Sequence, residues 1–114
     1  MDQAIFALPI LPGQTEAARA FLKELNGGRK QELAACNRGV GVVKELWAIQ
    51  QSPQGDLFVG YIVGEDIAHA FQFLAASQDA FDVWLKEQFQ KTTGADFSTP
   101  PSGPLSEVLA DYEV

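Results

Sequence analysis

Residues 40–63 are predicted to form a β-hairpin, and both of its faces carry apolar side chains. An antiparallel sheet with one face in water would show a polar residue at every second position, and this segment does not. The turn is predicted at residues 52–56, a Ser-Pro-Gln-Gly-Asp segment. We therefore expect something to cover each face of the hairpin.

The chain before the hairpin predicts one strand and one helix. Residues 4–10 form a short apolar run bounded by prolines, which is typical of a buried strand. In the following helical segment, Leu22 and Leu33 are eleven residues apart, about three turns at 3.6 residues per turn. One apolar stripe therefore continues past the Asn-Gly-Gly at 26–28, and we expect a single long helix that ends at residues 37–39.

The chain after the hairpin predicts two helices, over residues 65–74 and 79–89, and a terminal strand over residues 106–114. The resulting order, β-α-β-β-α-(α)-β, is typical of an α+β ferredoxin-like plait, with a four-stranded antiparallel sheet and helices on one face. We expect one domain over residues 1–114. Because the helices cover only one face, a second copy packed sheet against sheet would cover the other, so we expect a homodimer.

Composition limits the partners. The chain has 114 residues, a net charge of −7 and one cysteine. The negative charge argues against nucleic acid and against anionic membrane surfaces, and no apolar run approaches the roughly 20 residues that span a bilayer. The N-terminus lacks a basic signal-peptide region, and one cysteine excludes an internal disulfide, so a cytoplasmic location is expected. No zinc spacing or phosphate-binding glycine loop is present, and no cofactor or metal is expected.

Short motifs along nearly the whole chain resemble the dimeric α/β-barrel superfamily and, within it, a small bacterial domain family of unknown function. They are Leu11-Pro12-Gly13-Gln14, Arg29-Lys30-Gln31-Glu32-Leu33, Gly41-Val42-Val43-Lys44-Glu45, Gly64-Glu65-Asp66, Ala76-Ser77, Phe81-Asp82 and Glu107-Val108-Leu109-Ala110-Asp111-Tyr112. The narrower family would be expected to carry histidine around residues 79–85, where this chain has none. The superfamily includes cofactor-free monooxygenases, isomerases, haem proteins and ligand-sensing domains, so the resemblance implies a fold rather than one activity.

Two charged residues fall where apolar ones are expected. Arg29 lies on the apolar stripe of the first helix, where it could hold a carboxylate or enolate, or could extend its head to solvent or pair with Glu45. Glu45 lies mid-strand, where burial against the helices would raise its pKa and make it a candidate general base. Because Lys44 and Glu45 are adjacent, they must point to opposite faces of the sheet. If Glu45 faces the second subunit, it is an interface contact instead.

Four aromatic residues could form the wall of a ligand cavity or simply fill the core: Trp47, Tyr61, Phe81 and Trp84. His69, the only histidine, is expected on a helix surface, and Cys36 is expected to be a small buried apolar group.

Three functions remain open. The protein could bind a small apolar or carboxylate-bearing molecule between helices and sheet. It could be a cofactor-independent monooxygenase- or isomerase-like enzyme that uses Glu45 and Arg29, or a purely structural dimer.

Overall fold

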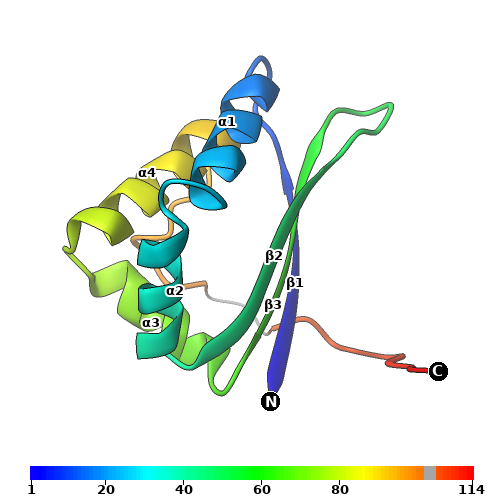
Figure 1. Cartoon of the computed structure of the whole chain (residues 1–114). Helices are drawn as coiled ribbons and strands as arrows, with labels where there is room; N and C mark the ends of the chain where they lie inside the picture. The colour runs from blue at the N-terminus through cyan, green and yellow to red at the C-terminus, as the bar shows by residue number, and fades with distance from the viewer. Residues whose placement is uncertain (102–104) are drawn as a thin grey trace.

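The computed structural model describes residues 1–101 and 105–114, and its described elements form one antiparallel sheet covered by helices on one face (Figure 1). The elements are β1 (Asp2–Pro9), α1 (Thr15–Leu25), α2 (Lys30–Gly39), β2 (Val42–Gln50), β3 (Leu57–Gly64), α3 (Ile67–Ala76) and α4 (Ala80–Thr93). The strand order is β1-β3-β2, with both pairs antiparallel. The α+β class and the central hairpin are therefore as the sequence predicts.

The described residues form three strands rather than the four that were expected. Residues 105–114 run past β1 without a backbone ladder, and the chain end leaves the body of the molecule (Figure 1). The Ser106 hydroxyl accepts a hydrogen bond from the backbone N–H of Ile5 and donates one to its C=O. These bonds occupy the two backbone groups of Ile5 that would pair with a fourth strand. Leu109 and Tyr112 are 82% and 85% exposed. In the single chain, these two side chains lie in solvent and not in a fourth strand.

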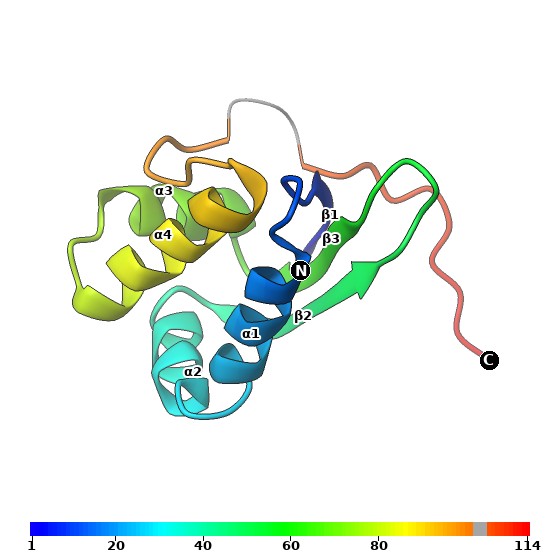
Figure 2. The same cartoon turned by 90° about the horizontal axis from the view of Figure 1, so that it is seen from above.

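The predicted long helix is two helices, α1 and α2, joined by a turn (Figure 2). The N–H of Arg29 bonds to the C=O of Glu24, one residue further back than in an α-helix. A Cβ on Gly27 would lie 2.9 Å from the Lys23 carbonyl oxygen, so the turn depends on glycine there. The eleven-residue spacing still has the expected effect, since Leu22 and Leu33 both pack against the core.

An aromatic cluster joins the sheet to the helices. Phe58 on β3 packs on Phe21 of α1 and Phe89 of α4, with ring centroids 6.0 and 5.3 Å apart. Trp47 on β2 lies against both Phe58 and Phe89 at 5.2 and 5.1 Å. Trp47 pairs in register with Gly60, and a Cβ on Gly60 would lie 2.1 Å from Cζ3 of the indole. The glycine therefore makes the space in which the Trp47 ring lies across the sheet.

The other face of the sheet is not covered by the helices (Figure 1). Ile5 on β1 is 55% exposed, and Val43 and Leu46 on β2 are 62% and 48% exposed. The hairpin is thus buried on its inner face and open on its outer face in the single chain. In the part of the chain that is described, no helix has the length and hydropathy needed to cross a bilayer.

Candidate functional site

Glu45 points to the helix side of the sheet. A bulge between Val42 and Lys44 inserts Val43 as an extra residue in β2, which leaves Val43 and Lys44 both exposed. Beyond the bulge, Glu45 and Trp47 turn inward together. Of the two orientations open to Glu45, the structure therefore has the one that a general base requires.

Two donors hold the Glu45 carboxyl in place. The Trp47 indole Nε1–H donates to Oε2 at 2.7 Å, and Asn37 Nδ2 of α2 donates to Oε1 at 3.2 Å. Burial raises the pKa of Glu45, and these two hydrogen bonds lower it by less. The carboxyl therefore exchanges its proton at a higher pH than an exposed glutamate would.

Glu45 lies where two spaces meet. A small interior cavity of about 60 Å³ lies between the sheet and α2, α3 and α4. An open groove of about 1340 Å³ runs along the edge strand β2 against α1 and α2. The two spaces share four lining residues, namely Asn37, Val42, Glu45 and Trp47. The groove alone reaches the few hundred Å³ that ligand sites usually occupy.

A second polar network adjoins the interior cavity. Cys36, which also lines that cavity, donates from Sγ to Oδ1 of Asp82 at 3.3 Å, and Ser77 donates from its hydroxyl to Oδ2 at 2.6 Å. Burial, followed by the hydrogen bond and charge of Asp82, raises the pKa of the Cys36 thiol to about 12. Lys86 caps the end of α3 by donating to the carbonyls of Ala75 and Ser77. The thiol stays protonated, so this network fastens α2 to α4 and offers no nucleophile.

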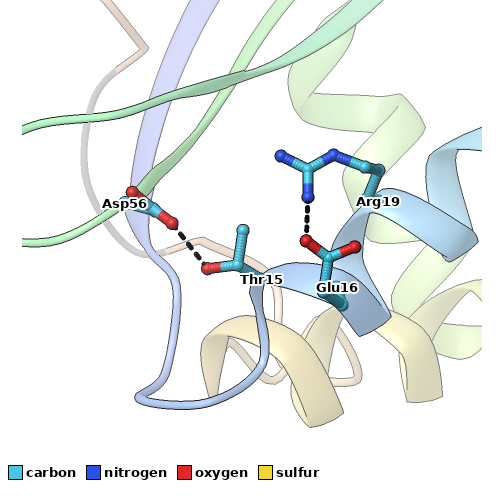
Figure 3. A network of polar contacts seen from close by, with 4 residues as sticks. All are labelled: Thr15, Glu16, Arg19 and Asp56. Carbon is cyan, nitrogen blue, oxygen red and sulfur yellow. Dashed lines mark hydrogen bonds and ion pairs between the residues drawn. The ribbon is translucent and has the colours of Figure 1, made fainter.

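Hydrogen bonding also fixes the start of α1 (Figure 3). Thr15 donates from its hydroxyl to Asp56 Oδ2 in the loop between β2 and β3, at 2.7 Å. One turn later, Arg19 pairs with Glu16 and lines the groove. The loop thus sets where the helical wall of the groove begins.

The six predicted site residues fall into three places. Glu45 and Trp47 are in contact at the groove. Arg29 stacks over the Trp84 ring at 4.1 Å and pairs with exposed glutamates, and Phe81 packs on that same indole. These three lie outside the linings of both spaces. Tyr61 lies on the outer face, where its hydroxyl donates to Gln3.

Asn37 and Asp82 are not among the site residues that the sequence predicts. Asn37 stands near the end of α2, in a segment typical of a helix stop, and nothing local shows that its amide reaches Glu45. Asp82 is 4% exposed although it stands in the first turn of α4.

His69 is exposed, as the sequence predicts. Within residues 1–101 and 105–114, no three His, Cys, Asp or Glu side chains gather as metal ligands would.

Comparison with known proteins gives one informative likeness. No family model matches the chain, and no curated protein matches it. Among solved structures, the crystal structure of an L-rhamnose mutarotase from Formosa agariphila matches with a TM-score of 0.61 and 16% sequence identity. The match covers 98% of this chain and 100% of that chain. At this identity the likeness shows a shared fold over the full length.

Proposed function

We propose that this protein binds a small molecule in the groove along β2 and exchanges a proton with it through Glu45. The observation that carries the proposal is the position of this carboxyl. It is half-buried, desolvation raises its pKa, and it lines an open space large enough for a ligand. Perturbed carboxyls in clefts are common at catalytic sites.

The dimensions of the two spaces support the groove as the place where a ligand would bind. Substrate-sized sites usually occupy about 300–1,000 Å³. The interior cavity holds about 60 Å³, whereas the groove holds about 1340 Å³. A ligand would therefore lie in the groove, with its reacting end toward Glu45 and its apolar part against Trp47 and Leu22.

The chemistry that fits is a cofactor-independent isomerisation. In its ionised form, Glu45 can take a proton from a hydroxyl or an acidic C–H and return it to another atom of the same molecule. In anomeric interconversion of a sugar, the C1 hydroxyl loses its proton, the ring C–O bond breaks, and the ring oxygen gains a proton. The fold shared with an L-rhamnose mutarotase supports testing this reaction first. Arg29 would not serve as the anion holder, because its guanidinium is engaged by Trp84 and Glu24.

The test is an NMR measurement of anomeric exchange in L-rhamnose and in a panel of other aldoses. We expect the wild-type protein to speed exchange of at least one sugar and Glu45→Gln to reduce that rate at least tenfold, within the usual range for loss of a general base. Glu87→Gln, an exposed glutamate of α4 outside the groove, is the matched control and should leave the rate unchanged. Absence of catalysed exchange, or equal loss in both variants, would refute the isomerase proposal.

A binding protein without catalysis is the alternative, and a direct measurement separates it. The Trp47 indole N–H contacts Glu45, so its NMR signal should move when a molecule enters the groove. A sugar that shifts this signal in the wild-type protein but is not interconverted would favour binding alone. If no sugar of the panel shifts this signal, the groove does not bind sugars. That result would favour the interpretation of the protein as a purely structural dimer.

We further propose that the protein is a homodimer joined through the outer face of its sheet. Ile5 and Leu46 expose about half of their surface there, and Tyr61 lies on the same face. An apolar face of this kind is typical of a surface that is buried by association. The matching face of a second copy would supply a covering of the same chemistry.

A further inference from the structure

We propose that the ligand of the groove is anionic, a small molecule whose carboxylate or phosphate group is held by basic side chains of α1 and α2. This inference rests on the proposed function, because it concerns the same groove, and it names the class of ligand.

The charge of the groove is opposite to that of the rest of the molecule. Five of the eight basic residues line the groove, against two of the fifteen acidic ones, Glu45 and Glu65. The five basic residues are Arg19, Lys23, Lys30, Arg38 and Lys44. A chain with a net charge of −7 thus gathers most of its positive charge along one open space. Clefts lined by one sign of charge concentrate ligands of the other sign.

Most of these cations are free to bind a ligand. Among the described residues, Arg19 alone of the five has an ion-pair partner within 4.0 Å, the neighbouring Glu16. In contrast, Arg29, which lies outside the groove, has two. The chain therefore neutralises Arg29, which the sequence offered as a possible anion holder, and among the described residues it leaves four of the five groove cations without a carboxylate partner.

Two cations of the helical wall, Lys23 and Lys30, lie at the other end of α2 from Glu45. Lys23 is in the last turn of α1 and Lys30 is in the first turn of α2, so both flank the turn between the helices, where Asn26 also lines the groove. Glu45 lies on the facing strand, near the end of α2. A ligand held by its anionic group at the turn would keep clear of the Glu45 charge while its hydroxyl-bearing end extends toward that carboxyl.

The experiment uses three sugars that share one pyranose ring: D-glucose, D-glucuronate and D-glucose 6-phosphate. Binding is followed by the indole N–H signals of the two tryptophans, since Trp47 lines the groove and Trp84 does not. We expect millimolar glucuronate or glucose 6-phosphate to shift Trp47 and leave Trp84 in place, and glucose to shift neither at the same concentration. The charged sugar that binds more tightly identifies the carboxylate or the phosphate as the preferred group.

Charge reversal provides the control. Lys23→Glu and Lys30→Glu should each weaken binding of the charged sugar about fivefold, and added salt should weaken it in the wild-type protein. Lys91→Glu changes the net charge equally but lies on α4 outside the groove, and it should have no effect. Equal shifts by glucose and its charged forms, no shift by any of the three, or equal loss in all three variants would refute the proposal. A change in sedimentation of Lys30→Glu would also refute it, because the groove would then be a contact between copies.

The two proposals fail separately. If charged sugars bind through Lys23 and Lys30 while Glu45→Gln catalyses aldose exchange as well as the wild-type protein does, the anion site stands and the role of Glu45 fails. If neutral aldoses are interconverted through Glu45 and charged ones are not preferred, the role of Glu45 stands and the anion site fails.

Discussion

The ionised form of Glu45 destabilises the folded protein, and this effect can be measured. Its pKa is raised in the folded protein, chiefly by burial, so the fold favours the protonated carboxyl. The stabilisation from the protonated form is present below the unfolded pKa and is lost as the pH rises through the higher folded pKa. Above its folded-state pKa, the folded protein therefore holds a carboxylate that water would solvate better.

Glu45→Gln should raise the free energy of unfolding at pH 7 by on the order of 1 kcal/mol, and the gain should shrink toward pH 4. Glutamine keeps an oxygen for the Trp47 indole, and a flip of the Asn37 amide presents an oxygen to the new NH₂ group. Urea unfolding at both pH values measures the effect, with Glu87→Gln as the exposed control. A gain that is equal at pH 4 and pH 7 would show that ionisation of Glu45 is not its cause.

Gly60 sets the position of Trp47 and, through it, of Glu45. An alanine Cβ would lie 2.1 Å from the indole, so Gly60→Ala forces the ring to move and strains its bond to the Glu45 carboxyl. We expect a loss of about 1–3 kcal/mol in urea unfolding. Gly28→Ala meets nothing within 4 Å and should change stability by less than about 0.5 kcal/mol. Equal effects of the two substitutions would contradict this account of Trp47.

Cys36 should resist alkylation. With a pKa of about 12, its thiol has very little thiolate at pH 8, so iodoacetamide should modify the native protein at least ~100-fold more slowly than the protein unfolded in guanidinium. Asp82→Asn removes the charge that raises this pKa and should speed the native reaction. Both rates are measured by mass spectrometry. A native rate close to the unfolded rate would show that the thiol is neither buried nor bonded as described.

At the level of elements, the sequence predicts those strands and helices that depend on the local order of apolar and polar residues. Two apolar runs on either side of the turn at residues 52–56 predict β2 and β3, and the eleven-residue spacing predicts the apolar stripe shared by α1 and α2. Two features could not be predicted in this way: the helix break at Gly27 and the absence of a fourth strand from the described residues. Both depend on backbone contacts between particular groups, such as the bond from the Ile5 N–H to the Ser106 hydroxyl. The same limit applies to the site, where Glu45 and Trp47 were predicted but the donor from Asn37 was not.

The C-terminal segment is the element that contributes least to the single chain. Beyond Ser106, its one side-chain hydrogen bond to the sheet is from Gln3 to Asp111, and Leu109 and Tyr112 are exposed. Deleting residues 107–114 should therefore change the unfolding free energy of the monomer by less than about 0.5 kcal/mol at low protein concentration. Leu105→Ala, which removes a side chain packed on the core, should cost more. A large loss on deletion would mean that this segment packs on the sheet.

At the level of the whole molecule, the outer face of the sheet supports the proposed homodimer. Both faces of the hairpin carry apolar side chains, and the helices cover one of these faces (Figure 1). The outer face exposes more apolar side chain than a sheet in water usually does, since Ile5, Val43 and Leu46 are about half exposed or more. A second copy would bury these residues together with Tyr61 against the same face of its partner.

Sedimentation should therefore give a dimer at micromolar concentration, and Leu46→Lys should convert it to a folded monomer. Lysine is tolerated at this exposed position in one chain, but the variant would bury two unpaired ammonium groups across a two-fold interface, and each costs several kcal/mol. Phe73→Lys is the matched control, because Phe73 of α3 is also 48% exposed but lies on the helical layer. It should remain dimeric. A wild-type monomer, or dissociation by Phe73→Lys alone, would place the interface elsewhere and leave the outer face without a partner.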